Sequence, residues 1–298
     1  MSQRATAFAL LTLMPLFYAS NAIFGRSAVD DVAPFTLAFL RWFIVFVILL
    51  LLSGRSALHL PKAARGRLNS LFWLGVLGML VCGGVFYVAL RYTTATNTSL
   101  IYVSTAIIIV VLEYIFLRRQ VRLAELCGVL IGFVGVGYII FAGDWERLKA
   151  FKFGLGEAIV FGCAIAWAAY SLVLRRAEFV ELNGLQLFAL TAGAGSAVLF
   201  PFAMVETLYL QTFPTGWGDW QTIFGVALVS ALIPFWIFQH GVRTVGPTLT
   251  GVFIYLMPVY GMALAAYFLG EQIRPYHLWG AAITLFGVIL ATAPTRAS

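Results

Sequence analysis

The sequence predicts an all-α polytopic membrane protein with ten transmembrane helices, arranged as two related five-helix halves that lie oppositely in the bilayer. Three observations predict this fold class. First, hydrophobic residues make up 62% of the 298 residues and charged residues only 10%, with a mean hydropathy of +0.95. Second, the apolar residues form stretches of about 20 along the whole chain, the length that crosses a bilayer core. Third, the chain contains an internal repeat with an offset of about 150 residues.

Each expected helix is an apolar stretch, and most of these stretches end at an ordinary stop signal. Arg118-Arg119, Gly143-Asp144, Arg175-Arg176 and Gly246-Pro247 mark such ends. The expected spans are 5–24, 33–52, 69–90, 96–117, 123–142, 155–174, 184–205, 220–241, 247–268 and 275–293. Few residues are left between the spans, so we expect the lipid bilayer as the main partner and no soluble domain.

Lys and Arg fall in the gaps between the spans, where they report the orientation of the chain. Of the 19, twelve lie on the side of the N-terminus and seven on the other side. The positive-inside rule therefore predicts that both termini face the cytoplasm. The net charge of +7 does not indicate a nucleic-acid partner, because the basic residues form no continuous stripe.

The internal repeat is carried by Gly, Arg and Gln residues, which match by chance less often than apolar residues do. The matched positions are Phe116-Leu117, Gln120, Arg122, Gly128 and Gly135 in the first half and Phe268-Leu269, Gln272, Arg274, Gly280 and Gly287 in the second. The halves are 1–143 and 154–298. Because each has an odd number of helices, the second copy enters the bilayer from the opposite face, as in secondary transporters. The repeat also argues against a removed signal peptide, because helix one has a counterpart in helix six.

Several short stretches follow one another along the chain in an order that is typical of one transporter family. They are Ala19-Ser20-Asn21 with Gly25-Arg26, Pro34 to Leu40-Arg41-Trp42, Ala89-Leu90-Arg91-Tyr92, and Leu269-Gly270-Glu271-Gln272. In this order and doubling, the chain resembles the drug/metabolite transporter (DMT) superfamily in its ten-helix form with two EamA-type repeats. Within it, the chain looks most like bacterial YddG-like exporters of aromatic and neutral amino acids.

The resemblance implies a secondary transporter of the bacterial inner membrane that exports small neutral, partly apolar metabolites by alternating access. The first half departs from the pattern, with Arg118-Arg119-Gln120 where the second has Gly270-Glu271-Gln272, and Ala106 in place of Pro258. The two halves therefore need not move identically. A proton-coupled exporter of drugs or other metabolites from the same superfamily is the alternative.

Matched polar and aromatic residues in helices one and six are the first candidates for a substrate cavity. Tyr18 and Asn21 share one helix face, and Trp167 and Tyr170 have the same spacing at the matching positions. A buried Asn also stabilises helix packing by about 0.6–2 kcal/mol, so Asn21 has a purely structural interpretation as well. If the substrate carries a ring and a zwitterionic head, Trp167 and Tyr102 would stack on the ring, and Asn21 or Gln239 would hydrogen-bond the head.

Further candidates for substrate binding lie in helices three, four, eight and nine. They are Tyr87, Tyr102, Trp236, Gln239, His240 and Tyr255. Tyr102 and Tyr255 lie several residues inside their spans, which favours an interior position. Tyr87, Trp236 and His240 lie near helix ends, where an interfacial belt explains such residues equally well.

Ionisable residues and prolines within spans are candidates for gating or energy coupling. Glu113 lies near the end of helix four, and a structural carboxylate that snorkels to water is the alternative interpretation. Arg41 opens helix two, where it would pair with Asp30 or Asp31 or clamp the outer end. Pro234 and Pro258 are possible hinges, although static kinks in helices are equally common.

We expect no enzyme, metal or cofactor. The sequence has no His-Glu-x-x-His zinc pair, and its aspartates fall outside the span centres. It shows no filter loop of a channel, no acid deep in helix one of the kind that cation antiporters use, and no set of cavity Lys or Arg residues suited to phosphate. A small-molecule substrate remains the expected partner. Energy coupling stays open, and a monomer or weak homodimer is expected.

Overall fold

The structure is a computed structural model that describes residues 3–53, 68–149, 151, 153–176, 179, 181–210, 213–269 and 272–293, and within these the side chains of 20–31, 95–96, 265 and 268–269 are not described. Every regular element in this part of the chain is a helix. The elements are α1 (Gln3–Asp31), α2 (Pro34–Ser53), α4 (Leu68–Leu74), η2 (Gly75–Val85), α5 (Phe86–Ala89), α6 (Ala95–Val103), α7 (Thr105–Leu117), α8 (Leu123–Ile140), α9 (Trp145–Lys149), α10 (Leu155–Leu174), α11 (Gly184–Leu210), α12 (Trp217–Gly225), η4 (Val226–Leu232), α13 (Ile233–Thr244), α14 (Pro247–Val252), η5 (Phe253–Leu256), α15 (Met257–Leu269) and α16 (Pro275–Thr292).

The helices agree with the predicted class, an all-α membrane protein. Nine stretches among the described residues are long and apolar enough to cross a membrane, and each coincides with an expected span. They are Pro34–Ser53, Leu68–Ala89, Asn97–Leu117, Leu123–Ile140, Leu155–Leu174, Gly184–Leu210, Trp217–Thr244, Pro247–Leu264 and Pro275–Thr292. The remaining expected span, 5–24, lies within α1, a continuous helix of 29 residues. The total of ten stays a prediction.

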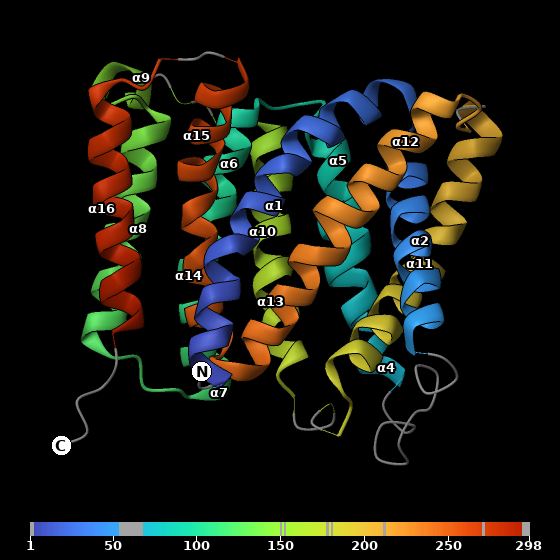
Figure 1. Cartoon of the computed structure of the whole chain (residues 1–298), viewed down its shortest axis with the longest axis horizontal. Helices are drawn as coiled ribbons and strands as arrows, with labels where there is room; N and C mark the ends of the chain where they lie inside the picture. The colour runs from blue at the N-terminus through green and yellow to red at the C-terminus, as the bar shows by residue number, and fades with distance from the viewer. Residues whose placement is uncertain are drawn as a thin grey trace.

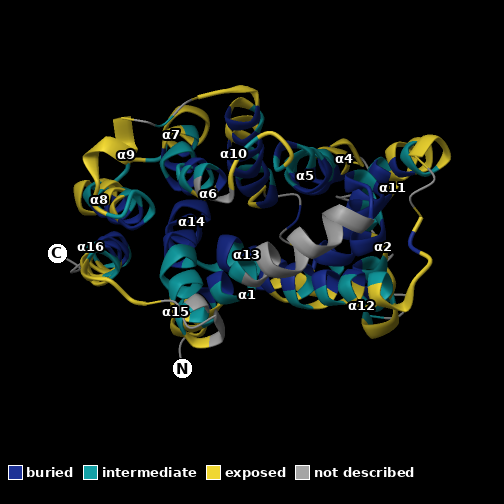
Figure 2. Ribbon diagram, turned by 90° about the horizontal axis from the view of Figure 1, so that it is seen from above, coloured by how far each residue is buried: buried dark blue, intermediate teal, exposed yellow. Residues whose placement is uncertain are grey.

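The helices stand side by side between two ends of the molecule (Figure 1). α1 begins and α16 ends at the same end, the lower one in this view. From above, α8 and α16 form a pair at one side, α2, α11 and α12 lie at the other, and α1, α13 and α14 lie between them (Figure 2). Buried residues face the interior of this arrangement, whereas the outer faces carry exposed apolar side chains such as Phe72 and Phe286, as expected of a surface that meets lipid.

Glycines bring α8 and α16 into direct backbone contact. A methyl group on Gly128 would lie 2.6 Å from the carbonyl oxygen of Gly287, and one on Gly135 would lie 3.0 Å from the carbonyl oxygen of Gly280. Small residues permit this approach between membrane helices, where packing replaces the hydrophobic effect. These glycines therefore permit the close packing of α8 against α16.

Two π-helical segments interrupt the third and eighth expected spans. η2 covers Gly75–Val85 and η4 covers Val226–Leu232. Both pack against α2. At Gly75, an added methyl group would lie 2.8 Å from the backbone of Ala194 in α11, so only glycine fits there. π-helical turns widen a helix and commonly mark functional segments.

Candidate functional site

Trp167 lies at the centre of a buried cluster of aromatic side chains. Its ring centroid is 5.3 Å from that of Tyr170, 5.0 Å from Phe235 and 4.7 Å from Phe238, and the Trp167 side chain is 2% exposed. The first pair is stacked and the second meets edge to face, both favourable geometries for aromatic rings. Rings from α10 and α13 thus form the core of the interior.

Tyr18 from α1 joins the same cluster. Its ring meets Trp167 edge to face at 6.3 Å and Phe235 at 5.9 Å. Trp42 of α2 lies on the other side of Phe235, with 4.5 Å between ring centroids. Tyr102 extends the cluster toward α6, 6.4 Å from Trp167. We call Tyr18, Trp42, Tyr102, Trp167, Tyr170, Phe235 and Phe238 the aromatic cluster.

The aromatic cluster contains polar atoms that are buried and unpaired. Within the described residues, the Tyr18 hydroxyl and the indole nitrogens Nε1 of Trp42 and Trp167 have no hydrogen-bond partner. Buried N–H and O–H groups are nearly always paired in native proteins, and each unpaired one costs about 1–3 kcal/mol. These atoms are therefore available to a polar ligand or water in the interior.

Gln239 joins the aromatic cluster to a cavity near the lower end of the molecule. Its Nε2 donates to the Tyr170 hydroxyl at 2.9 Å and to the Thr191 hydroxyl at 3.0 Å, and its Oε1 has no partner among the described residues. The cavity has a volume of about 540 Å³ and is lined by Asn183, Gly184, Leu185, Trp236, Gln239, His240, Arg243 and Thr244. Gln239 therefore contacts both the cavity and Tyr170 of the aromatic cluster.

Arg41 and Tyr87 form a second polar group beside Trp42. The Arg41 side chain is 4% exposed, and its Nη1 donates to the Tyr87 hydroxyl at 2.7 Å. The guanidinium carbon lies 5.1 Å from the ring centroid of Trp42 and 5.2 Å from that of Tyr87, within range of cation–π attraction. The predicted pairing with Asp30 or Asp31 concerns side chains outside the described residues.

Glu113 is held by residues from both halves of the chain. It accepts hydrogen bonds from Arg119 at 2.8 Å, from Arg175 at 3.4 Å and from the Thr248 hydroxyl. Arg119 also binds both oxygens of Glu125, each at 2.9 Å. We call these five residues the Glu113 cluster. Both carboxylates are fully buried, so the snorkelling interpretation of Glu113 is wrong.

Charge pairing is strongest at Arg119, in the turn between α7 and α8. Burial alone lowers its pKa, but the hydrogen bond to Glu125 and the charges of Glu113 and Glu125 outweigh burial, so the pKa of Arg119 is raised. The guanidinium therefore stays charged at any physiological pH.

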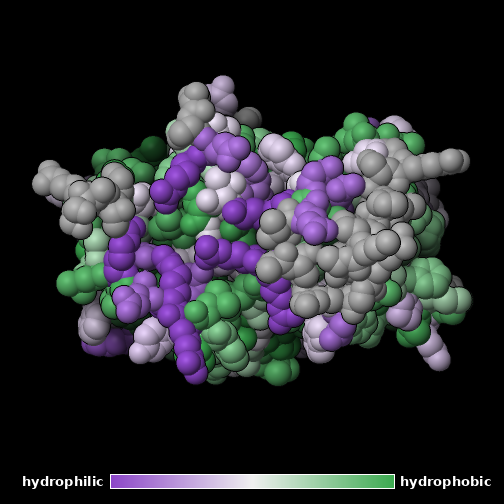
Figure 3. All heavy atoms as spheres, turned by 90° about the horizontal axis from the view of Figure 1, so that it is seen from below, coloured by the Kyte–Doolittle hydropathy of each residue, from purple (hydrophilic) through white to green (hydrophobic). Residues whose placement is uncertain are grey.

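Hydrophilic side chains gather on the face of the molecule seen from below (Figure 3), the end at which α1 begins and α16 ends.

The other predicted site residues lie apart from the aromatic cluster. Trp236 is 37% exposed and stacks on His240 at 5.9 Å, at the cavity rather than among the buried rings. Tyr255 is fully buried, and its ring packs over Gly132 of α8. Pro234 is near the start of α13, directly after η4, and Pro258 is near the start of α15, directly after η5. The side chain of Asn21 lies outside the described residues.

Sequence reasoning missed the apolar aromatic residues of the interior and four of the five residues of the Glu113 cluster. Phe235 and Phe238 carry no polar atom, so composition gave no reason to separate them from lipid-facing rings. Glu125 lies in the first turn of α8, where a carboxylate commonly serves the helix terminus. Its burial and its pairing with Arg119 depend on the fold of the turn 118–122.

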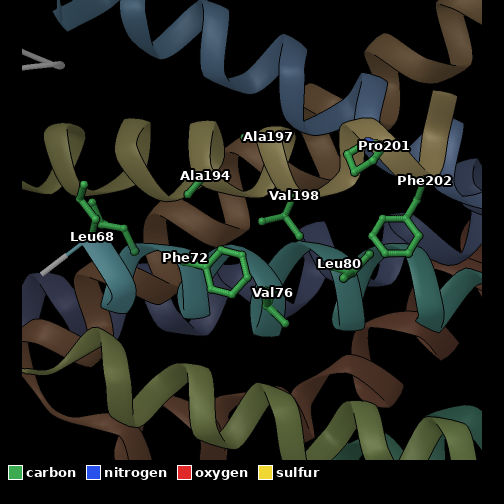
Figure 4. Close-up of a pocket in the computed structure, with 10 residues that line it drawn as sticks. Leu68, Phe72, Val76, Leu80, Ala194, Ala197, Val198, Pro201 and Phe202 are labelled. Carbon is green, nitrogen blue, oxygen red and sulfur yellow. The ribbon is translucent and has the colours of Figure 1, made fainter.

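A second groove runs between α4, η2 and α11 on the outer surface. It has a volume of about 630 Å³ and is lined by Leu68, Leu71, Phe72, Val76, Leu80, Ala194, Ala197, Val198, Pro201 and Phe202. The labelled side chains in Figure 4 are all hydrocarbon and converge from two neighbouring helices. None of the predicted site residues lines it. Its chemistry suits a surface in contact with lipid.

The described residues offer no group of three or more His, Cys, Asp or Glu side chains that would hold a metal ion. Cys82 and Cys163 each donate to a backbone carbonyl of the other's helix, at 3.3 and 3.4 Å. Among the described residues, the interior offers groups suited to noncovalent binding: aromatic faces, N–H and O–H groups without a partner, and the buried guanidinium of Arg41.

The curated relatives are named as transporters. The chain is 26% identical over 257 residues to the uncharacterized transporter YyaM of Bacillus subtilis, covering 85% of this chain and 81% of that protein. It is 25% identical to an uncharacterized transporter of Archaeoglobus fulgidus, over 95% of this chain and 96% of that protein. It is 22% identical to a protein of Streptantibioticus cattleyicolor named "Probable terminal-alkyne amino-acid exporter", over 96% of this chain and 93% of that protein.

A solved structure described only as a crystal structure superposes with a TM-score of 0.74 at 20% identity. The superposition covers 99% of this chain and 100% of the other, and it shows a shared fold. The model of the EamA-like transporter family matches residues 5–141 and again 154–293. The chain therefore belongs to the EamA-like transporter family of the DMT superfamily, as a multi-pass membrane transporter and not an enzyme.

Proposed function

We propose that the protein is a secondary transporter that exports small neutral, partly apolar metabolites, among them aromatic and other neutral amino acids, by alternating access. The observation that carries this proposal is the aromatic cluster around Trp167 with its unpaired buried N–H and O–H groups. Rings offer stacking to an apolar side chain, and the unpaired groups offer hydrogen bonds to a polar head.

The mechanism that we propose uses the two halves, 1–143 and 154–298, as inverted repeats that rock about the substrate. The contacts that join the halves support it, because Tyr18 from the first half meets Trp167 from the second, and Glu113 from the first half meets Arg175 and Thr248 from the second. We place the protein in a bacterial inner membrane, with both termini in the cytoplasm, as a monomer or weak homodimer.

One relative supports amino acids as the cargo. The Streptantibioticus cattleyicolor protein, 22% identical over nearly the whole chain, carries an amino-acid exporter's name. The alternative is a proton-coupled exporter of drugs or other metabolites. Glu113 is the residue that this alternative would use, and its two arginine partners, Arg119 and Arg175, are the groups that a protonation step would release.

Transport into proteoliposomes tests the proposal. Purified protein is reconstituted and given labelled tryptophan, phenylalanine, threonine or a cationic dye, each with and without an imposed pH gradient. We expect saturable transport of tryptophan and phenylalanine and none of the dye. Transport of the dye without the amino acids would overturn the substrate class. A requirement for the pH gradient would favour the alternative.

A matched pair of tryptophan variants tests the location of the site. Trp167→Ala removes the ring on which the aromatic cluster converges, so tryptophan transport should fall at least about tenfold, as for a lost aromatic contact of about 1.5 kcal/mol or more. Trp279→Ala removes a 64% exposed ring on the outer face of α16 and should leave transport unchanged. Equal activities of the two variants, at equal amounts in the membrane, would place the site elsewhere.

A further inference from the structure

Arg41 brings a positive charge into the interior without an acidic partner. It lies on α2 seven residues after Pro34, about 10 Å along the helix, and is 4% exposed. Among the described residues, no Asp or Glu forms an ion pair with it. Of the other buried charged groups described, Glu113 and Glu125 are paired with Arg119, and Glu157 accepts hydrogen bonds from Thr93 and Asn97. A buried charge inside a span is costly unless it is paired, and it usually marks a functional position.

The groups around Arg41 supply more donors than acceptors. The Tyr87 hydroxyl accepts a hydrogen bond from Arg41 Nη1, and the rings of Trp42 and Tyr87 flank the guanidinium. Arg41 Nε has no hydrogen-bond partner among the described residues, and neither has Trp42 Nε1. Two buried N–H groups from adjacent residues thus lack an acceptor.

The Arg41 guanidinium, through Nη2, and the Trp42 indole N–H both lie against one point of η2, where the chain has a glycine. A methyl group on Gly83 would lie 3.2 Å from Arg41 Nη2 and 3.5 Å from Trp42 Nε1. Because Gly83 has no side chain, no Cβ of η2 stands between the guanidinium and the indole N–H at this point. A planar guanidinium with an indole N–H beside it is complementary to an acceptor with two oxygens in one plane, which is the geometry of a carboxylate.

The same donors border the aromatic cluster. Trp42 meets Phe235 edge to face at 4.5 Å, and Phe235 meets Trp167 at 5.0 Å. A solute with its acidic group at Arg41 would therefore lay its apolar part against Phe235 and Trp167. An organic cation in the same place would meet a guanidinium of its own sign.

We propose that Arg41 and Trp42, opposite Gly83, form the receptor for a carboxylate group of the transported solute. This inference rests on the proposed function and narrows it: the cargo is a carboxylic acid with an apolar body, such as an amino acid, and solutes in which the carboxylate is replaced or missing are poor cargo.

Competition in proteoliposomes tests the carboxylate requirement on the wild-type protein. Uptake of labelled tryptophan is measured against unlabelled tryptophan, indole-3-propionate, tryptophanamide and tryptamine. Tryptophan and indole-3-propionate keep the carboxylate and should compete, whereas tryptophanamide and tryptamine lack it and should be at least about tenfold weaker, as for a lost hydrogen bond to a charged group. Equal competition by all four would overturn the inference but not the proposed function. No uptake of labelled tryptophan, phenylalanine or threonine would overturn the proposed function and, with it, this inference.

Variants of Arg41 and Gly83 test whether Arg41 is the residue that requires a carboxylate on the solute. Arg41→Gln should abolish the preference for tryptophan over tryptophanamide, and Arg41→Lys should keep part of it, because Lys retains the charge without the planar fork. Arg147→Gln, at an exposed ion pair with Asp144, is the matched control and should behave as wild type. Gly83→Ala places a methyl group between the donors and should weaken tryptophan more than tryptophanamide. Equal losses for both solutes in Arg41→Gln and in Gly83→Ala would show a structural role and overturn the assignment.

Discussion

Gln239 is the residue at which the cavity meets the aromatic cluster. Its amide donates to two buried hydroxyls, those of Tyr170 and Thr191. In Gln239→Leu both hydroxyls lose this donor, which should cost about 1–3 kcal/mol of stability and raise the KM for tryptophan. The measurements are thermal unfolding in detergent and proteoliposome uptake.

The control for Gln239→Leu is Gln221→Leu, an exposed glutamine of α12 in the same expected span. A Gln239→Leu protein with the unfolding temperature and KM of Gln221→Leu would show that these hydrogen bonds serve neither stability nor substrate entry.

Glu113 is the acidic residue that links the most elements of the molecule. Glu113→Gln keeps the shape of the side chain but removes the charge that Arg119 and Arg175 share. The loss of charged hydrogen bonds should lower the free energy of unfolding by about 1.5–3 kcal/mol. Both arginines are partly exposed, at 30% and 47%, so solvent screening favours the lower end of this range.

Glu146→Gln supplies the comparison, because Glu146 pairs with Lys149 at 2.7 Å on the surface and such a pair contributes about 0–1 kcal/mol. Thermal unfolding in detergent compares the two variants, and Glu113→Gln should unfold at the lower temperature. Equal unfolding temperatures would mean that burial adds nothing to the Glu113 cluster.

Single residues also show where prediction from sequence ends. Tyr18, Trp167 and Tyr170 could be predicted as interior residues from the sequence. They lie at matched positions of helices one and six, and a polar atom in a membrane span is not explained by contact with lipid. From sequence, Trp236 and His240 were candidates of the same kind as the buried aromatic residues, but they line the cavity instead. The rotation of α13 about its axis decides which of residues 236, 239 and 240 faces inward. The partners of Glu113 could not be predicted from the sequence, because one of them, Thr248, lies 135 residues away along the chain.

At the scale of elements, the glycine contact between α8 and α16 makes a sharp prediction. Gly128→Ala places a methyl group against the backbone of α16, which cannot move aside as a side chain can, and such overpacking costs about 1–3 kcal/mol. Gly137→Ala on the same helix meets nothing within 4 Å, and alanine stabilises a helix over glycine by up to about 1 kcal/mol.

Thermal unfolding in detergent should therefore rank Gly137→Ala at or above wild type and Gly128→Ala below it. The opposite order would mean that α8 and α16 are not in backbone contact in the membrane.

The helical spans themselves were predictable because the bilayer sets their length, and each of the nine described spans falls where an apolar stretch predicts it. The π-helical segments η2 and η4 could not be predicted from the sequence. An apolar, glycine-rich stretch shows no sign of whether its hydrogen bonds reach four or five residues back, since that depends on the helices packed around it. Both segments lie against α2, the helix that carries Arg41 and Trp42.

For the whole molecule, the distribution of Lys and Arg predicts that both termini face the cytoplasm. A green fluorescent protein fused to either terminus should be fluorescent, and an alkaline phosphatase fused after residue 293 should be inactive, because it folds only outside the inner membrane. Phosphatase activity from that fusion would reverse the orientation. The same end of the molecule carries Arg119, Arg122, Arg175 and Arg176, all in or next to the turns that close it.

The rocking of two halves predicts which distances change and which stay fixed. Spin labels at Gln120 and Arg176, in a background without the native cysteines, report the end closed by the Glu113 cluster. Labels at Leu123 and Ile289 report the pair α8 and α16, whose interlocked backbones should act as the pivot. If Glu113 holds the halves together, Glu113→Gln should add a longer distance between the first pair of labels and leave the second pair unchanged. A shift of both pairs by the same amount would mean that the molecule loosens as a whole, and no shift of the first pair would mean that the Glu113 cluster is a static support rather than a contact that opens during transport.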